Sequence, residues 1–326
     1  MLSKFLNTKT LIILLVILGG IYLITTLNKG EDRTFKSQLV DVDTSQVTKI
    51  KIIPSLGSDN EEITFTRTGE EWKLEADGKF FKPEVSSIKN ILTELLRMRT
   101  ERVSATSEEK WKELEVTDST ASRVQLFAGD DKLTDIYIGK FSYTQAPQQQ
   151  QNPYQRQQTR MFTNIREAGD ETVYVVEGFI KMNIQPKVDS YRAKTLVSVQ
   201  KENITKVSFN YPDDQFTVTN ENGNWFLNGQ PADSLETTRY LQKFSRLTNS
   251  NYADDVEMTT NTPSHTITIE ANNSVPVELK AFPADTTTQY IITTSRIPDT
   301  KFEGGKSRLF ERIFVGRSEF FKKTAE

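Results

Sequence analysis

The sequence contains no cysteine and only one histidine, His265. The absence of cysteine excludes disulfides, thiolate zinc sites, cysteine nucleophiles and an acylated lipoprotein N-terminus. A single imidazole leaves little scope for metal binding or acid–base catalysis. The net charge is only −3, with acidic and basic residues interspersed, so there is no basic field to attract nucleic acid. We therefore expect no cofactor, no metal and no nucleic-acid partner.

The sequence also lacks recognisable catalytic patterns. His265 begins a short alternating segment, on the same face as Ile267 and Ile269, and is expected to be a packing residue. The sequence has no phosphate-binding loop, and residues 41–43 lack the glycine and the closing glutamate of a calcium loop. No carboxylate pair stands out from the 44 acidic residues. The sequence therefore assigns no catalytic, cofactor-binding or metal-binding residue and predicts a protein that is not an enzyme.

One long apolar run contrasts with this polar composition. Residues 11–27 read LIILLVILGGIYLITTL and carry no charge. As a helix the run spans about 26 Å, and extension back through Lys9 brings it near the thickness of a bilayer core. The alternative is a cleaved signal peptide, but its apolar region is usually shorter, and no small-residue cleavage site follows here. The run predicts one uncleaved transmembrane helix, with Leu11–Leu27 in the lipid bilayer.

Charge does not decide the orientation of this helix, because lysines and arginines lie on both sides of it. A large domain behind a short basic tail is typical of exported proteins with a signal anchor. We therefore expect the N-terminus in the cytoplasm and the soluble part in the periplasm or outside the cell. The expected organisation is a cytoplasmic tail with its anchor, a linker and two soluble units, at 1–30, 31–46, 47–200 and 201–326.

The soluble part contains two segments that match position by position. The strand expected at 47–52 corresponds to the strand expected at 204–209, and a second strand and a glycine turn follow each. Trp72 and Trp225 then lie at the same offset, which is informative because the chain has only three tryptophans. Another glycine turn, a proline and an amphipathic helix come next in both copies. This pattern predicts a tandem duplication.

Each copy is expected to contain a three-strand meander, a helix and about four further antiparallel strands. The helix of the first copy is expected to begin at Ser86 or Ser87, and that of the second at Asp233 or Ser234, because these side chains make good N-caps. An aromatic segment from Leu309 is expected as the last strand of the second copy. Consecutive strands with short turns favour antiparallel sheets. The predicted fold class is α+β, a duplicated sheet-plus-helix unit behind one N-terminal transmembrane helix.

Two segments are candidates for contact with a partner. A glutamine-rich loop at 144–159 is either a tolerated surface insertion or a tether that uses Tyr154 and Arg156. The C-terminal segment from Lys306 mixes basic and aromatic residues. As a helix it would dock its aromatic face on a membrane or partner, and the alternative is that it closes the domain core. The candidate contact residues in this segment are Phe310, Phe314, Arg317, Phe320 and Phe321.

The order of these features resembles a known family. A membrane helix and a linker lead to a T-K-I-x-I strand (48–52), a tryptophan strand, a helix and a strand ending in Ile138-Gly139-Lys140. Over nearly its whole length the chain resembles the bacterial envelope family called domain of unknown function 4340. Genes of that family often accompany those of auxiliary ABC-type transporters, including relatives of the gliding-motility transporter. The resemblance implies the bacterial inner membrane and an integral membrane partner such as an ABC-type permease, but no site residues.

Two functions remain open at this point. The first is a membrane-anchored, non-enzymatic envelope protein that serves as an accessory, scaffold or ligand-presenting subunit of a membrane complex. The second is an envelope carbohydrate-active hydrolase or glycan-binding protein that uses carboxylates in a cleft between the two units. A deep acidic pocket near the junction at 189–200, with raised carboxylate pKa values, would favour the second function.

Overall fold

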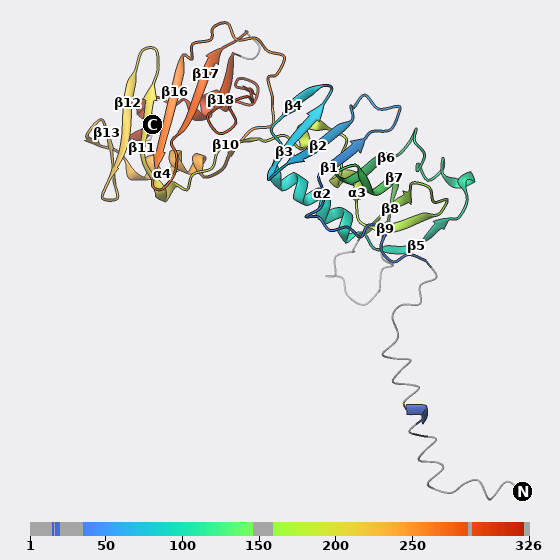
Figure 1. Cartoon of the computed structure of the whole chain (residues 1–326). Coiled ribbons are helices and arrows are strands. Elements are labelled where there is room, and N and C mark those ends of the chain that lie inside the picture. Colours follow the sequence, from blue (N-terminus) through green and yellow to red (C-terminus); the bar gives the residue numbers. More distant parts are fainter. Residues whose placement is uncertain (1–14, 16, 20–34, 146–158, 286–288, 323–326) are drawn as a thin grey trace, which may run out of the picture.

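The computed structural model describes residues 15, 17–19, 35–145, 159–285 and 289–322 (Figure 1). Two antiparallel sheets with few helices dominate it, which confirms the expectation of a mainly antiparallel α+β protein. Within these residues no helix is long and apolar enough to cross a membrane. The predicted span at 11–27 lies outside them except for residues 15 and 17–19, which are helical.

The first sheet has nine strands in the order β4-β3-β2-β1-β6-β7-β8-β9-β5, and all neighbours are antiparallel. We call this sheet and the segments packed on it unit 1. Its elements are β1 (Lys49–Ile53), β2 (Ile63–Thr68), β3 (Glu71–Ala76), β4 (Lys79–Phe81), α2 (Val85–Arg97), β5 (Thr100–Ala105), β6 (Ser122–Ala128), β7 (Asp131–Gln145), β8 (Thr159–Glu167), β9 (Val173–Glu177) and α3 (Ile180–Asn183), with 3₁₀ helices at Glu108–Lys110 and Val188–Ser190.

The second sheet has eight strands in the order β14-β13-β12-β11-β16-β17-β18-β19. We call it, together with the small β10-β15 sheet, unit 2. Its elements are β10 (Thr195–Val197), β11 (Ile204–Asn210), β12 (Gln215–Glu221), β13 (Asn224–Leu227), β14 (Gln230–Pro231), α4 (Ser234–Leu241), β15 (Leu247–Thr248), β16 (His265–Ala271), β17 (Val277–Pro283), β18 (Tyr290–Thr294), β19 (Phe302–Glu303) and α5 (Leu309–Ile313), with 3₁₀ helices at Lys201–Asn203, Gln242–Arg246 and Arg317–Phe320.

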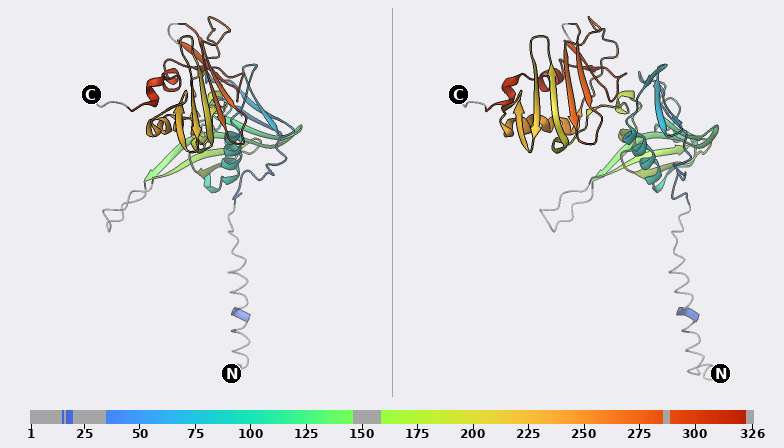
Figure 2. Two further views of the ribbon diagram at one scale, coloured as in Figure 1. Left: turned by 90° about the vertical axis from the view of Figure 1, so that its left-hand side faces the viewer. Right: turned by 60° about the vertical axis from the view of Figure 1, so that its left-hand side comes forward.

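Apart from one strand, the two sheets have the same order of connection. In each, the chain runs outward through four hairpin-linked strands, β1 to β4 or β11 to β14, and a helix follows. The next strand differs, because β5 joins the far edge of the first sheet beside β9, whereas β15 pairs with β10 outside the second sheet. The chain then returns to the free side of β1 or β11, at β6 or β16, and continues strand by strand toward the opposite edge. Trp72 and Trp225 lie in the corresponding strands β3 and β13. Figure 1 and the right view in Figure 2 show the two units side by side.

The predicted three-strand meander is one strand too short. A short fourth strand, β4 or β14, pairs with β3 or β13 in each unit. The turns before them, Asp77-Gly78 and Asn228-Gly229, have positive φ at both residues (50° and 65°, 48° and 80°). Two consecutive positive φ values are typical of type I′ hairpin turns, whose twist matches that of paired strands. These turns therefore fold the chain back into another strand before the helix begins.

Each unit has its own hydrophobic core. In unit 1, helix α2 packs on the sheet through residues at three- and four-residue spacing, namely Ile88, Ile91, Leu92 and Leu95. The core of unit 2 is more aromatic, with Phe209 stacked on Phe216 at 4.3 Å between ring centroids. Buried residues of the first core run from Leu39 to Tyr191, and those of the second from Ala193 to Phe320. The predicted domain limits stay predictions.

The predicted N-cap of α2 is wrong, because the helix begins at Val85 and its N-cap is Glu84. The Glu84 N–H donates to the carbonyl of Tyr191 (2.7 Å), and Pro83 forms an isolated β-bridge with Arg192. These contacts hold residues 83–84 extended, so the helix starts directly after them. In α4 the predicted cap Asp233 is confirmed, since its carboxylate accepts from two backbone N–H groups of the first turn.

The expectation of a strand from Leu309 is also wrong. This segment forms α5 and a 3₁₀ helix, and the last strand of the sheet is the two-residue β19 before it. The apolar residues at 309, 310, 313 and 314 have the three- and four-residue spacing of a helix rather than the alternation of a strand.

Candidate functional site

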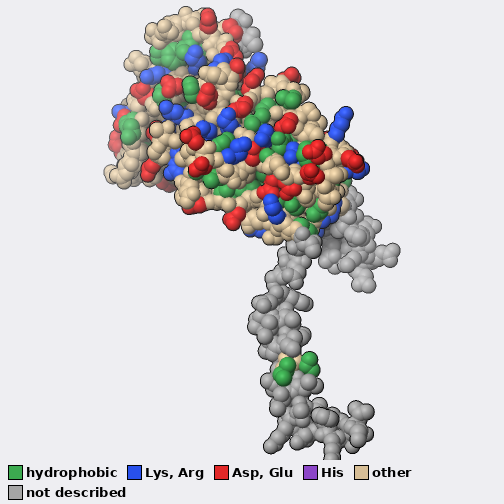
Figure 3. Space-filling model, turned by 45° about the vertical axis from the view of Figure 1, so that its right-hand side comes forward, with side chains coloured by type: hydrophobic (Ala, Val, Ile, Leu, Met, Phe, Trp, Pro, Cys, Tyr) green, Lys and Arg blue, Asp and Glu red, His purple; other side chains and the backbone are tan. Residues whose placement is uncertain are grey.

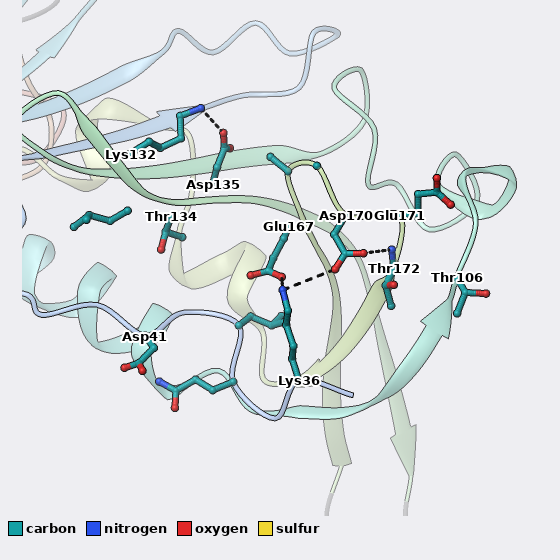
Figure 4. Close-up of a pocket in the computed structure, with 15 residues that line it drawn as sticks. Lys36, Asp41, Thr106, Lys132, Thr134, Asp135, Glu167, Asp170, Glu171 and Thr172 are labelled. Atoms are coloured by element: carbon teal, nitrogen blue, oxygen red, sulfur yellow. Dashed lines mark hydrogen bonds and ion pairs between the residues drawn. The ribbon is translucent and has the colours of Figure 1, made fainter. Parts of the chain in front are cut away.

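The N-terminal segment joins unit 1 at the free edge of its sheet. Thr100, the first residue of edge strand β5, donates its N–H to the carbonyl of Ser37 (3.1 Å) and its hydroxyl to that of Lys36. The Lys36 ammonium donates to Glu167 and lies 4.0 Å from Asp170 (Figure 4). The hydrogen bond to Glu167 raises the pKa of Lys36. These contacts fix the point where the N-terminal segment meets unit 1.

An open cleft of about 900 Å³ lies beside this point. Five carboxylates and two ammonium groups line it, from Asp41, Asp135, Glu167, Asp170, Glu171, Lys36 and Lys132. Figure 4 shows Lys132 directed at Asp135 and Lys36 directed at Glu167 and Asp170. In the part of the chain that the structure describes, no group of three or more acidic or histidine side chains is placed to hold a metal ion. The cleft is therefore lined by acidic groups, several of which are paired with a cation.

Asp135 is held in the ionised form by the groups that surround it in this cleft. Only 9% of its side chain is exposed, and Arg123 donates to both of its oxygens, at 2.6 and 2.7 Å. Lys132 and Gln125 donate to it as well, at 2.8 and 3.0 Å. Burial pushes the pKa of Asp135 up, but the hydrogen bonds from Arg123 and Lys132 outweigh it and hold the pKa below its usual range. Such a group stays ionised at neutral pH and is no general acid.

A buried guanidinium joins the two units. Arg192 is only 4% exposed, and it donates to the two carboxylate oxygens of Asp254 at 2.5 and 2.8 Å. Its central carbon also lies 4.2 Å from the ring centroid of Phe81 and 3.7 Å from that of Tyr252. Phe81 belongs to β4 of unit 1, whereas Tyr252 and Asp254 belong to unit 2. Arg192 therefore contacts both units through charge and ring faces together.

A cavity of about 330 Å³ lies at this junction, with Asp189, Arg192 and Asp254 among its lining residues. Asp189 also accepts a hydrogen bond from Arg192, at 3.2 Å. Burial disfavours the charged form of Arg192, but the bonds to Asp254 and Asp189 outweigh it and raise the pKa of Arg192. A glycan hydrolase at this position would need a carboxyl group with a raised pKa. Both of these carboxylates are instead engaged with the buried cation.

The β7-β8 hairpin extends from unit 1 as an arm (Figure 2). Tyr143 pairs with Met161 and Phe141 with Thr163, which puts Phe141, Tyr143 and Met161 on one face of the ribbon. These three side chains are 42, 63 and 40% exposed. At the base of the arm, the Phe141 ring lies 4.4 Å from the Phe179 ring. We call Phe141, Tyr143 and Met161 the apolar face of the arm.

Three exposed arginines lie close to the point where the N-terminal segment meets unit 1. Arg97 ends α2, and Arg99 and Arg102 flank Thr100 in the chain. Arg99 donates only to the backbone carbonyls at 96 and 98, and Arg102 lies 5.8 Å from the Phe162 ring centroid. None of the three pairs with a carboxylate of a described residue. Figure 3 shows acidic and basic side chains interspersed elsewhere on the face that it draws.

The family of the chain follows from its sequence match. Residues 81–266, more than half of the chain, match the sequence model of the family described as Domain of unknown function (DUF4340). The protein belongs to the DUF4340 family. No curated protein and no solved structure matches the chain. The DUF4340 match begins in β4 and ends in β16, so it includes the arm, the three arginines and the junction around Arg192.

The Ile138-Gly139-Lys140 motif of this DUF4340 chain has a packing role. A Cβ on Gly139 would lie 2.5 Å from the carbonyl oxygen of Leu114 and 2.6 Å from a methyl group of Val116. The Lys140 N–H donates to the same Leu114 carbonyl, at 2.9 Å. Only glycine lets the loop at 106–121 lie this close to β7. The motif therefore holds a loop on the outer face of the sheet.

The predicted partner-contact residues lie in different environments. Tyr154 and Arg156 of the glutamine-rich loop lie outside the described residues. In the C-terminal segment of this DUF4340 chain, Phe314 and Phe320 are buried, at 8 and 0% exposure. The Phe310 ring stacks on a neighbouring ring at 3.8 Å and is only partly exposed. These three aromatic rings pack on the core of unit 2.

Two residues of the same segment remain at the surface. Phe321 is 39% exposed, and Arg317 makes a bidentate ion pair with Asp214, at 2.5 to 2.9 Å. This pair lowers the pKa of Asp214 and raises that of Arg317. Contact of Arg317 and Phe321 with a partner stays a prediction.

His265 is half-buried and packed among aromatic rings of unit 2. Its ring centroid lies 4.8 Å from that of Tyr211 and 5.0 Å from that of Phe310. Ser264 hydrogen-bonds its Nδ1 at 2.9 Å. Burial lowers the pKa of His265, and the charge of Asp213 offsets part of this shift. The neutral imidazole is therefore favoured, which suits the expected packing role.

Sequence reasoning missed the two most distinctive features, the junction and the arm. Arg192 and Asp254 are 62 residues apart, and no local pattern relates them. The arm did leave a signal, because the alternation Phe141-Ser142-Tyr143-Thr144 extends the strand beyond Ile138, where the prediction ended.

Proposed function

We propose that this DUF4340 protein is a membrane-anchored, non-enzymatic envelope protein that serves as an accessory or scaffold subunit of a membrane complex. The observation that carries the proposal lies in the N-terminal apolar run. Its described residues Leu15, Ile17 and Leu18 are helical, and they are 72, 52 and 58% exposed. Uncovered apolar side chains in an uncharged run are favourable in hydrocarbon and unfavourable in water. The run at 11–27 therefore anchors the chain in the bacterial inner membrane as a single span.

The soluble part is held close to the membrane in this proposal. Seven residues lie between Leu27 and Phe35, and the eight steps from one Cα atom to the next over this stretch reach about 29 Å when fully extended. The contacts of Lys36 and Ser37 with Thr100 then fix the chain to unit 1. The linker thus sets a short distance between the bilayer and unit 1, which we place in the periplasm or outside the cell, with the N-terminus in the cytoplasm.

We further infer that units 1 and 2 are a tandem duplication. Their common order of connection and the corresponding positions of Trp72 and Trp225 support this inference. A duplicated unit in which several carboxylates are paired with cations suits a scaffold or ligand-presenting role. No observation favours the hydrolase alternative, and two of the carboxylates that line the junction cavity, Asp189 and Asp254, are bonded to Arg192.

The partner in this proposal is an integral membrane protein. The family resemblance makes an ABC-type permease the first candidate. A single-pass anchor with its soluble units held near the bilayer would bring both units within reach of the exposed loops of such a permease.

The test uses the full-length chain in its native membrane. We expect it to remain in the membrane after alkaline carbonate extraction and to be crosslinked to an integral membrane protein. An Ile17→Arg/Leu18→Arg variant places charge in the span, which is unfavourable there, and is expected to be released. Leu56→Arg is the matched control, because Leu56 is 80% exposed on unit 1 and should stay in the membrane. Release of the unaltered chain, or its recovery only as a free monomer, would contradict the proposal.

A further inference from the structure

The arm, the three arginines and the point where the N-terminal segment meets unit 1 lie together. Arg99 and Arg102 flank Thr100, which binds the N-terminal segment. The arm adjoins the same edge strand near its loop end, since Arg160 of β8 lies 3.5 Å from Glu101 of β5. Figure 1 shows the end of α2 beside β5, and both views in Figure 2 show the arm projecting from unit 1.

We propose that this end of unit 1 binds the surface of an anionic lipid bilayer, through the apolar face of the arm and the arginines Arg97 and Arg99. Arg102 lies over the Phe162 ring, on the opposite face of the ribbon, and is not part of this surface. The proposal rests on the anchor proposed above. Because the linker reaches at most about 29 Å, it keeps the point where the N-terminal segment meets unit 1 within that distance of the bilayer. Direct contact between this end of unit 1 and the bilayer is therefore possible.

The charge of the surface fits anionic lipid. Arg160, near the loop end of the described arm, is neutralised by Glu177 through two hydrogen bonds, at 2.9 and 2.6 Å. Arg97 and Arg99 have no such carboxylate partner among the described residues. A cation near an anionic bilayer surface strengthens binding by roughly fivefold per residue at moderate salt. Two unpaired arginines together bias this end of unit 1 toward anionic lipid.

The side chains of the arm are suited to a position in the headgroup layer of a bilayer. One face carries Phe141, Tyr143 and Met161. The opposite face carries Ser142, Thr144 and Arg160, together with Phe162, whose ring is buried at 6% exposure. A ribbon with exposed apolar side chains on only one side is suited to lie in the interface rather than to cross the bilayer. Tyrosine in particular favours this region, because its ring is apolar and its hydroxyl is polar. The arm would therefore rest its apolar face on the lipid and keep its polar face in water.

The experiment exploits the absence of cysteine in the chain. Full-length protein with Tyr143→Cys carries a nitroxide spin label and is reconstituted in nanodiscs of equal parts phosphatidylcholine and phosphatidylglycerol. The measured quantity is the ratio of two collision rates of the spin label, with oxygen and with a water-soluble nickel chelate. This ratio rises when the label is immersed in lipid. We expect this ratio to be clearly higher at 143 than in the Ser142→Cys control on the opposite face and in Val275→Cys, which is 84% exposed on unit 2. Met161→Cys provides a second reporter on the apolar face.

Charge is tested with the same label at 143. Replacing Arg97 and Arg99 with glutamine is expected to lower the docked-to-free ratio by about fivefold per residue at moderate salt. Replacing Arg246 and Arg296, exposed cations of unit 2, is the matched control and should change nothing. Nanodiscs of phosphatidylcholine alone should weaken docking as the arginine substitutions do.

The outcomes separate this proposal from the proposed anchor. Failure of the chain to incorporate into nanodiscs would contradict the anchor. Incorporation with an equally aqueous label at 143, 142 and 275 would overturn docking and leave the anchor intact. If neither the arginine substitutions nor the removal of anionic lipid changes the immersion of the label, the role of the arginines is overturned. Shielding of the label only after membrane protein extract is added would assign the arm to a protein partner and overturn lipid docking.

Discussion

The guanidinium of Arg192 and the carboxylate of Asp254 form two parallel hydrogen bonds across the junction of the two units. Arg192 is buried with 5% of its side chain exposed, whereas 33% of the Asp254 side chain is exposed. The rings of Phe81 and Tyr252 contact the same cation. Burial raises the pKa of Tyr252 to about 12, so its ring stays neutral beside this pair. Through the side chain of Arg192, this contact joins two units that each have their own hydrophobic core.

Removal of the carboxylate partner should destabilise the junction. Asp254→Asn leaves the Arg192 cation buried with a neutral amide, and we expect a loss of about 2 kcal/mol in the free energy of unfolding, below the full cost of breaking a buried pair because Asp254 is partly exposed. Urea unfolding measures this loss. Asp255→Asn is the control, because 90% of the Asp255 side chain is exposed beside Lys79, and it should change little. Equal effects of the two substitutions would contradict the role given to Asp254.

The close approach at Gly139 predicts a second loss of stability. Gly139→Ala places a methyl group against the Leu114 carbonyl and Val116, so the loop at 106–121 must move. We expect a loss of about 1–3 kcal/mol in thermal or urea unfolding. Gly57→Ala is the control, because nothing lies within 4 Å of a Cβ at that position. A stable Gly139→Ala protein would show that the loop yields without cost.

Two neighbouring phenylalanines of the C-terminal segment should differ sharply. Phe320 is fully buried in unit 2, so Phe320→Ala is expected to cost about 3–5 kcal/mol of stability. Phe321 is 39% exposed, and Phe321→Ala should change stability by less than about 0.5 kcal/mol. Calorimetry of both variants measures the difference. A large loss at Phe321 alone would mean that the burial of this segment differs in solution.

His265 gives a prediction for pH dependence. Its pKa is lowered from 6.5 by burial among aromatic rings, although Asp213 opposes the shift. The unfolded chain therefore binds a proton at higher pH than the folded chain, and stability should fall as the pH drops below about 6.5. NMR titration is direct, because the chain has no other histidine. A measured pKa above 6.5 would contradict the burial argument, and His265→Gln should remove this contribution to the pH dependence.

Local patterns predicted local structure. The alternation around Trp72 and Trp225 predicted β3 and β13 because period two is visible within a few residues. Pairings between distant segments were not predictable, as in β5 beside β9, because one sequence does not reveal which strands become neighbours. The segment from Leu309 was predicted as a strand although its apolar spacing is helical. The Arg192 junction depends on residues far apart in the chain, and so sequence analysis could not find it.

The sheet edges described above bear on self-association. β4, β14 and β19 are only two or three residues long, and β5, the longest edge strand, pairs with β9 through two irregularities in register. Short or irregular edges offer few consecutive backbone groups to another sheet. Chains confined side by side on a two-dimensional surface meet far more often than chains in solution. With such edges, crowding of this kind would not lead one copy to extend the sheet of the next into a fibre.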